Sequence, residues 1–233
     1  MENIKVICHM LISIDGKVTG SYLENKHISE CLDHYYRIHR ELNGDAFACG
    51  RVTMEGSFTH GFYPDLSKYD GSDVVFDDFV ANHSQTKYAV AFDRKGKLGW
   101  KNGTLFDEDE GYSNRHIIEV LTKEVNPSYL AYLRSIGVSY IFAGDKELDI
   151  ENALRKLNKL FNIKTLLLEG GSIIDGAFLL ASLVDELSLV LTPMIGNTND
   201  KPLFYESIET CFILNKVEKL DDKTIYLHYL KKD

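Results

Sequence analysis

Residues 164–182 read KTLLLEGGSIIDGAFLLAS and contain one strand-loop-helix unit. Lys164–Leu168 predicts a short buried strand, and Ser172–Ser182 predicts a helix. The two glycines between them would let a ligand approach the backbone closely and leave the first N–H groups of the helix open to a phosphate. A tight turn with Ser172 as the N-cap is the simpler alternative. The G-x-G-x-x-G and Gly-Lys-Ser/Thr patterns are missing, so neither a Rossmann fingerprint nor a P-loop is indicated.

The same alternation of strands and helices extends along most of the chain. We expect further strands at Lys5–Ile14, Asp45–Cys49, Tyr88–Phe92, His116–Thr122, Val138–Ala143 and Glu186–Thr192, and further helices at Ser29–Leu42, Pro127–Ile136 and Ile150–Phe161. Cys211–Leu220 and Lys223–Leu230 flank Asp221-Asp222 and predict a terminal antiparallel hairpin. This alternation predicts an α/β fold with a mainly parallel central sheet flanked by helices. Neither a repeat nor a linker-like composition divides residues 1–233, so we expect one domain.

Two segments read as long loops, Phe58–His83 and Trp100–Arg115. The first is rich in aromatic residues and aspartates. Loops of this length inside a compact domain are usually functional or mobile. We therefore keep two alternatives for the first loop: a lid over a ring-shaped substrate, or a solvated insertion packed on its own aromatic side chains.

Composition excludes several classes of function. The chain has 26 lysines and arginines against 35 aspartates and glutamates, which gives a net charge of −9. Such a surface repels phosphate backbones and anionic lipids, so we expect no nucleic-acid or membrane partner. The four cysteines form no CxxC pair, and the histidines show no ligand spacing, so we expect free thiols and no metal site. The first residues do not resemble a signal peptide and no apolar run is long enough to span a membrane, which predicts a cytoplasmic protein.

Three more strand ends carry polar residues: Ser13-Ile14-Asp15-Gly16-Lys17, Gly50-Arg51-Val52-Thr53 and Asp93-Arg94-Lys95-Gly96. Ligands of open α/β sheets bind beyond the carboxyl ends of the strands, so these residues are candidates for a binding site. Arg51 could form bidentate bonds to a phosphate such as the 2′-phosphate of NADP. A carboxylate and an ammonium, from Asp15, Lys17 and Glu169, could orient a polar heterocycle and shuttle a proton during hydride transfer. An ordinary turn at Asp15-Gly16 and a surface Arg51 are the simpler alternatives.

Five motifs in this order resemble one known family. They are Ser13–Lys17, Asp45–Thr53, Phe92–Leu98, Leu168–Gly171 and Val184–Leu187. Together they are similar to the C-terminal reductase domain of bacterial riboflavin-biosynthesis deaminase–reductases and its stand-alone relatives, which share the dihydrofolate-reductase-like fold. The resemblance covers roughly Ile4 to Phe204 and identifies the chain as a stand-alone member of that group.

The resemblance implies a cytoplasmic, homodimeric reductase that uses NADPH to reduce a ribosylamino-pyrimidine. The positions implied to bind the cofactor are Gly20, Gly50, Arg51, Thr53, Arg94, Gly170, Gly171, Ser172 and Ile173. Lys17 and Glu169 match positions that engage the pyrimidine in catalysis, and Asp15 shapes the turn before Lys17. Asn25 and His27 fall where the family places further substrate and cofactor contacts.

The departures from the family lie on the substrate side. The family usually follows its Gly-x-x-Thr with a segment whose arginine grips the substrate phosphate, but residues 55–64 read EGSFTHGFYP and contain no arginine. Losing an arginine–phosphate pair removes a strong charge-assisted interaction. Two alternatives therefore stay open: a dihydrofolate-reductase-like reductase of a different substrate, pterin or carbonyl, and a nucleotide-binding module that has lost catalysis.

Overall fold

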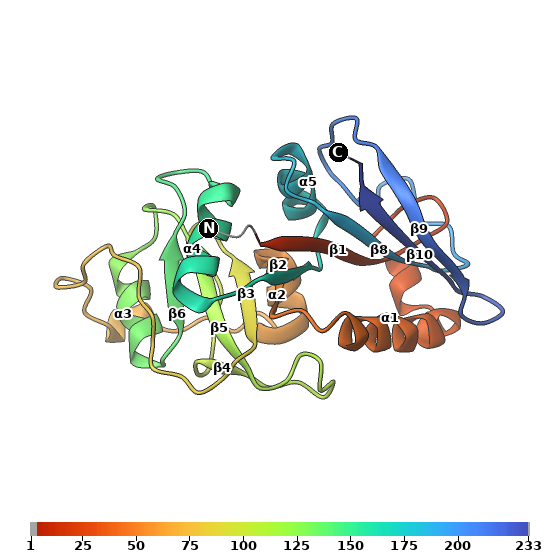
Figure 1. Ribbon diagram of the computed structural model, residues 1–233. Helices are drawn as coiled ribbons and strands as arrows, with labels where there is room; N and C mark the ends of the chain where they lie inside the picture. Colours follow the sequence, from red (N-terminus) through yellow and green to blue (C-terminus); the bar gives the residue numbers. More distant parts are fainter. Residues whose placement is uncertain (1–3, 233) are drawn as a thin grey trace. The chain divides into compact units, whose positions relative to one another are not determined.

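The computed structural model of the chain describes residues 4–232, which fold into two compact units (Figure 1). Unit 1 is Asp45–Lys164 together with Ile4, and unit 2 is Lys5–Gly44 with the residues from Thr165 onward. Unit 1 is thus nearly continuous in sequence, whereas unit 2 combines two separate segments. The expected single domain of residues 1–233 remains a prediction.

Unit 1 is built on parallel strands. Its elements are β2 (Ala46–Gly50), α2 (Arg51–Met54), η3 (Glu55–Thr59), η4 (Leu66–Lys68), β3 (Tyr88–Phe92), β4 (Thr104–Leu105), β5 (Arg115–Leu121), α3 (Pro127–Ser135), β6 (Ser139–Phe142) and α4 (Ile150–Phe161). Strand β3 pairs in parallel with β2 and β5, and β5 also pairs in parallel with β6. Only the short β4 is antiparallel within this unit, on β5, among the described residues.

Unit 2 combines a parallel trio with the terminal hairpin. Its elements are β1 (Lys5–Ile12), η1 (Ser21–Glu24), η2 (Lys26–Ile28), α1 (Ser29–Leu42), β7 (Thr165–Leu168), α5 (Ser172–Leu180), β8 (Glu186–Leu191), β9 (Phe212–Lys219) and β10 (Ile225–Lys231). Strand β1 lies between β7 and β8 and is parallel to both, while β10 is antiparallel to β8 and β9. The α/β class with a mainly parallel sheet and a C-terminal antiparallel hairpin is therefore confirmed.

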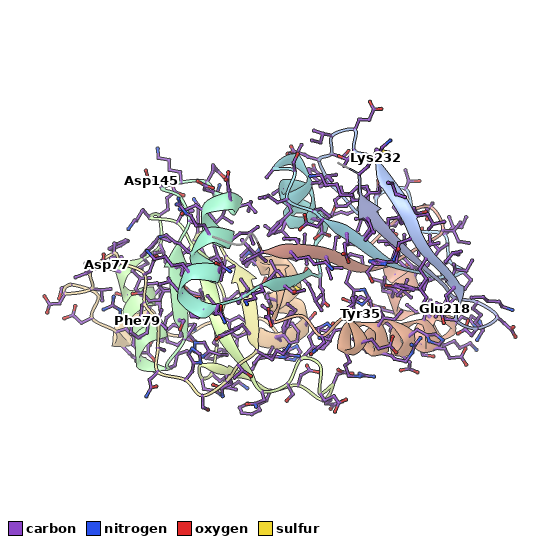
Figure 2. The ribbon with its side chains drawn as sticks, in the orientation of Figure 1. Tyr35, Asp77, Phe79, Asp145, Glu218 and Lys232 are labelled. Carbon is purple, nitrogen blue, oxygen red and sulfur yellow. The ribbon has the colours of Figure 1, made fainter. Side chains whose placement is uncertain are left out.

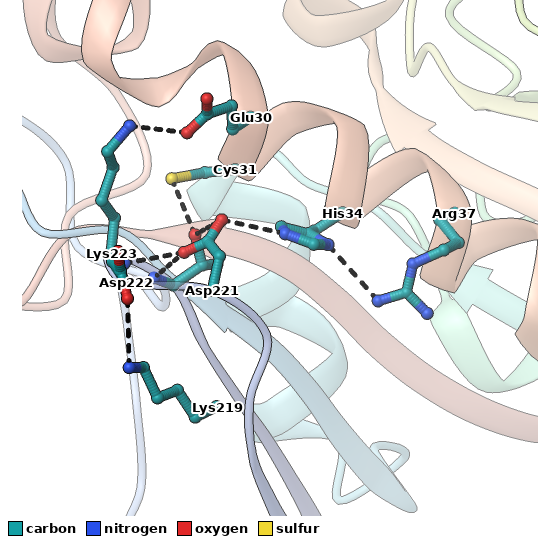
Figure 3. Close-up of polar contacts among 9 residues, drawn as sticks. Glu30, Cys31, His34, Arg37, Lys219, Asp221, Asp222 and Lys223 are labelled. Atoms are coloured by element: carbon teal, nitrogen blue, oxygen red, sulfur yellow. Dashed lines mark hydrogen bonds and ion pairs between the residues drawn. The ribbon is translucent and has the colours of Figure 1, made fainter.

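Helix α1 packs on β1, β8 and β10 through the apolar stripe that predicts it. Ile38 and Cys31 are buried there against Leu11, Val190 and Tyr226. The helix ends where Asn43 adopts the left-handed conformation, at φ 49°. The loop of the hairpin is fastened to this helix by polar contacts (Figure 3).

The aromatic side chains of the 58–83 segment are packed individually against unit 1. The rings of Phe58, Tyr63, Tyr69, Phe76 and Phe79 each contact a ring outside the segment. These outside rings belong to β2, α3 and β6. The expectation of an insertion packed on its own aromatic residues is thus wrong for these five positions. The lid remains a prediction.

The four cysteines are free thiols, as the sequence predicts. Cys8 and Cys49 are buried free thiols, as is Cys31, and Cys211 is an exposed free thiol. Residues 4–232 contain no helix that is both long and apolar enough to cross a membrane.

Candidate active site

The segment Ser13–Lys17 leaves β1 in a tight turn. The Ser13 hydroxyl donates to Asp15 Oδ1 at 2.6 Å and accepts the Lys17 N–H at 2.8 Å. Gly16 has a φ of 76°, a left-handed value that side chains rarely adopt. The Ser13 hydroxyl and the Gly196 N–H both donate to Asp15, and they hold the pKa of its carboxyl below the usual value. Asp15 is therefore a carboxylate at neutral pH, next to an ammonium in the sequence.

Residues 194–206, which we call the strap, hold this turn from a distant part of the sequence. Lys17 Nζ donates to the carbonyl of Asp200 at 3.0 Å, and Gly196 N donates to Asp15 Oδ1 at 2.9 Å. Val18 N and Lys201 O are also hydrogen-bonded, at 2.9 Å. The strap therefore orients both charged side chains of the turn.

The other end of the strap is fastened to helix α5. The Ser172 hydroxyl donates to the carbonyl of Pro202, and Tyr205 N donates to the carbonyl of Ser172 at 3.0 Å. A side chain at Gly176 would meet the backbone of Glu206 at 2.7 Å. One segment thus joins the turn after β1 to the first turn of α5.

Position 20 accepts only glycine, because a side chain there would be strained and would clash with Asp200. Its φ is 125°, and a Cβ there would lie 2.1 Å from Asp200 Oδ2. Asn25 and His27 follow shortly after, and their described contact is local: Asn25 Oδ1 accepts the His27 N–H at 3.0 Å and caps η2. His27 itself is exposed.

Glu169 is the first residue after β7 and is buried. Its Oε1 lies 2.5 Å from Nδ1 of His39, in the last turn of α1, and the two side chains are only 2% and 3% exposed. Gly170 follows with a φ of 90°, where a Cβ would lie 3.0 Å from the methyl carbon of Met10. The Gly170–Gly171 peptide bond is cis.

The N-terminus of α5 begins directly after the glycine pair. Gly171 is its N-cap residue, and no side chain caps it. The first N–H groups of such a helix are open to an anion, and the helix dipole favours negative charge there. Ser172 is buried, whereas Ile173 is 61% exposed. Ile14 and Ile195 are also exposed large apolar side chains, from the turn and the strap.

In unit 1, four of the predicted residues gather at the carboxyl ends of β2 and β3. Gly50 pairs in register with Phe92, so Arg51 and Thr53 follow β2 beside the segment that carries Arg94. Arg51 Nη1 forms an ion pair with Glu55 Oε2 at 2.5 Å. Arg94 forms an ion pair with Glu147, and its carbonyl accepts the N–H of Thr122 at 3.0 Å.

Asp93 stabilises this edge of unit 1. Its carboxyl accepts the backbone N–H groups of Lys97 and Leu98, and burial raises its pKa despite these bonds. Asp93 therefore stabilises the loop that leads away from β3. Residues 4–232 contain no group of three or more His, Cys, Asp and Glu side chains that could hold a metal ion.

The structure thus brings the predicted residues together in two sets. Gly50, Arg51, Thr53 and Arg94 share one edge of unit 1, while the strap joins the turn of Asp15 and Lys17 to Ser172 within unit 2. Sequence analysis missed the strap and His39. A run rich in Asn, Gly and Asp at residues 196–200 marks the strap as a loop, but nothing in it indicates what it holds.

The chain is similar to one known family over almost its whole length. The RibD C-terminal domain family matches residues 4–226. No curated protein matches by sequence.

Three solved structures show the same fold. A pyrimidine reductase-like protein from Corynebacterium diphtheriae has a TM-score of 0.67 at 17% identity, covering 100% of this chain and 92% of that one. The riboflavin biosynthesis reductase Rib7 of Saccharomyces cerevisiae has a TM-score of 0.61 at 17% identity, covering 99% and 90%. RibD of Acinetobacter baumannii has a TM-score of 0.65 at 17% identity, and the alignment covers 99% of this chain but only 58% of that protein. These likenesses confirm the dihydrofolate-reductase-like fold.

Proposed function

The chain belongs to the RibD C-terminal domain family, and from that membership we propose that it is an NADPH-dependent reductase of a pyrimidine ribosylamine in riboflavin biosynthesis. The observation that carries this proposal is the strap. It holds a carboxylate and an ammonium, Asp15 and Lys17, and is also bonded to the open N-terminus of α5. A group that binds phosphate and groups that orient a polar ring are what such a reduction needs.

Each unit offers groups that suit part of a dinucleotide. NADPH, when bound, supplies the hydride. We assign its pyrophosphate and nicotinamide half to Gly170–Ile173, because two glycines and uncapped N–H groups offer an anion site there. Gly20 belongs near the nicotinamide ribose. Gly50, Arg51, Thr53 and Arg94 would bind the adenosine side, with Arg51 recognising the 2′-phosphate.

The substrate ring is assigned to Lys17 and Glu169. Lys17 is oriented by its bond to the Asp200 carbonyl, and Asp15 keeps the turn in shape through Ser13. Glu169 is buried beside His39, so water is excluded from one side of its carboxyl. These groups would hold the heterocycle and exchange the proton that accompanies hydride transfer. Asn25 and His27 are proposed as further substrate contacts.

A second candidate is a related reductase whose substrate is a pterin or a carbonyl compound. The observation that favours it is the segment after α2, where η3 runs over Glu55–Thr59 without an arginine. Glu55 instead forms an ion pair with Arg51. A carboxylate at this place does not favour a phosphorylated substrate.

The cofactor assignment is tested by titration calorimetry with NADPH and NADH. We expect NADPH to bind more tightly, and Arg51→Ala to weaken NADPH about 10- to 100-fold while leaving NADH within about 2-fold. Arg37→Ala is the matched control, because Arg37 forms the same kind of i,i+4 pair, with Glu41 in α1. Equal binding of the two nucleotides by the unaltered protein would contradict the 2′-phosphate assignment.

The substrate is tested by comparing 5-amino-6-(5-phosphoribosylamino)uracil with its dephosphorylated form in NADPH oxidation. A kcat/KM at least about 100-fold higher for the phosphorylated form supports the riboflavin precursor. Equal values favour the second candidate. NADPH binding without turnover of either compound, or of pterin and carbonyl substrates, would leave only a nucleotide-binding module.

We also propose that the protein is a homodimer. Strand β9 exposes Ile213, Leu214 and Val217, each at 50% or more, on the hairpin of unit 2. Exposed apolar residues on an edge strand are candidates for contact with another chain. Light scattering should give the mass of a dimer, and Val217→Lys should shift it toward the monomer.

A further inference from the structure

Helix α1 carries two histidine–carboxylate pairs that differ in burial. His34 Nε2 lies 2.9 Å from Asp221 Oδ2, and these side chains are 23% and 26% exposed (Figure 3). The second pair, His39 and Glu169, is closer and almost completely buried. Of the two carboxylates, Glu169 is the one that the proposed function places against the substrate.

The buried pair is created by the fold and not by local sequence. His39 comes from the last turn of α1 and Glu169 from the end of β7, 130 positions further along the chain. A carboxylate in such a place is costly unless a hydrogen-bond partner or an opposite charge stabilises it. Without the imidazole, the carboxyl would lose a bond to one oxygen and would tend to take up a proton or to turn away.

Three further titratable groups that interact with Glu169 favour their uncharged forms. Cys8 and His9 approach from β1, and Asp175 approaches from the first turn of α5. Burial raises the pKa of Cys8 and Asp175 and lowers the pKa of His9. His9 is also engaged elsewhere.

His9 hydrogen-bonds to Ser188 through Nδ1 and to the Tyr35 carbonyl through Nε2. Its ring stacks on that of Tyr35, which is labelled in Figure 2, with centroids 4.3 Å apart. Both nitrogens of His9 thus have partners other than Glu169. The imidazole bonded to the Glu169 carboxyl is that of His39.

We propose that His39 is a positioning residue for Glu169, holding its carboxyl in one orientation during reduction of the substrate. This inference rests on the proposed function, because it takes Glu169 as the group that engages the ring. His39 itself need not touch the substrate. Its effect should therefore appear in turnover and in the pH profile, and not in cofactor affinity.

The test compares His39→Gln and His39→Asn with His34→Gln, which removes the exposed pair from the same helix. We expect His39→Gln to lower kcat about 10- to 100-fold while KM and the NADPH dissociation constant stay within about 3-fold. The limb of the kcat/KM profile that belongs to Glu169 should move to higher pH, because the carboxyl loses the imidazole beside it. If either His39→Gln or His39→Asn retains part of the kcat because its amide can still bond to Glu169, positioning is supported. His34→Gln should have the same kcat as the unaltered enzyme.

A second measurement uses the folded, unaltered protein. We expect the ring-nitrogen NMR signal of one of the eight histidines to titrate together with kcat/KM and to change in Glu169→Gln but not in His34→Gln. Normal kcat and an unmoved pH profile in His39→Gln would overturn the inference and leave the reductase intact. Histidine signals that ignore Glu169→Gln would overturn it as well. Absence of turnover in the unaltered protein would instead overturn the proposed function, and the inference with it.

Discussion

Two buried glutamates, one in each unit, are surrounded by different chemistry. Glu119, in β5 of unit 1, accepts the indole N–H of Trp100 and lies 3.4 Å from the Tyr129 hydroxyl. Its Oε2 is buried and has no hydrogen-bond partner among residues 4–232. Glu169, in unit 2, lies against an imidazole. Burial, with Asp93 nearby, raises the pKa of Glu119 well above its usual value.

The difference separates two uses of a buried carboxyl. Burial and the nearby Asp93 favour the protonated form of Glu119, against the hydrogen bonds from Trp100 and Tyr129. A protonated acid can hold a loop but has no charge to offer a ligand. A base beside Glu169 can share a proton with it, so that carboxyl can change its charge state during a reaction. Burial alone therefore does not distinguish the two carboxyls, and the base beside Glu169 is the difference on which its proposed role depends.

The largest effect that would sharpen this comparison is on turnover. Glu169→Gln should lower kcat of NADPH oxidation about 100- to 1000-fold, because the amide cannot exchange the proton. Calorimetry should show unchanged NADPH binding. Glu119→Gln should keep kcat within about 2-fold. If the two variants lose turnover equally, the distinction between the two glutamates is wrong.

The next effect is on stability and concerns Glu119. Folded Glu119 keeps its proton at pH values where the unfolded chain has lost it, so its contribution is complete below about pH 4.5 and is lost as the pH rises toward its raised pKa. Glu119→Gln should remove that loss, so the unfolding free energy of the variant should fall less between pH 5 and pH 8 than that of the unaltered protein. Urea unfolding at pH 5 and pH 8 measures it. If Glu119→Gln is less stable than the unaltered protein at pH 8, the claim that folded Glu119 is protonated is contradicted.

His116, a buried base of unit 1, should make stability depend on pH in the opposite direction. His116 hydrogen-bonds to Ser139 at 2.7 Å, and burial together with His83 lowers its pKa to about 4. The folded state disfavours the protonated ring, so stability is complete above about pH 6.5 and is lost as the pH falls toward 4. His116→Gln should flatten this acid limb by about 1–2 kcal/mol. Thermal unfolding of both proteins between pH 7 and pH 4.5 measures this difference. If His116→Gln loses as much stability with falling pH as the unaltered protein, His116 is not the group responsible.

The smallest effect on stability is expected for the partly exposed pair between His34 of α1 and Asp221. Burial alone would raise the pKa of Asp221, but the N–H groups of Lys223 and Thr224, the Thr224 hydroxyl and His34 bring it to about 2. That stabilisation is present above about pH 4 and is lost as the pH falls toward 2. Because the pair is partly solvated, His34→Gln should cost less than about 1 kcal/mol at pH 7. A loss above about 2 kcal/mol in urea unfolding would contradict a minor structural pair.

Much of the fold could be predicted from local patterns. Ser29–Leu42 and Ile150–Phe161 form helices with the predicted bounds, because apolar periodicity coincides with end signals such as Asp149, whose side chain caps α4. Tyr88–Phe92 is likewise a strand as predicted. The two-residue β4 and the short turns of η1 to η4 were missed, since they depend on tertiary contacts and have no period of their own.

The candidate site could be predicted only in part. Glycines and charged residues that directly follow predicted strands identify Asp15, Lys17 and Arg51 as candidates. Their roles stay predictions. The strap was not predictable, because its bonds to Lys17 run through backbone carbonyls that any residue provides. His39 is on the buried face of a predicted helix, but its partner is 130 positions away, beyond the reach of any periodic pattern.

The two-segment composition of unit 2 has a consequence for synthesis on the ribosome. Apart from Ile4, the described part of unit 1 is one continuous segment, Asp45–Lys164. Its contacts can therefore form while the chain is still growing. Helix α1 must wait: Glu30, Cys31 and His34 find their partners in the loop between β9 and β10, nearly 200 positions later (Figure 3). Until β8 and β10 have been synthesised, the apolar stripe of α1 lacks the surface that these strands provide. Termination before β9 should therefore leave this stripe partly uncovered and favour aggregation.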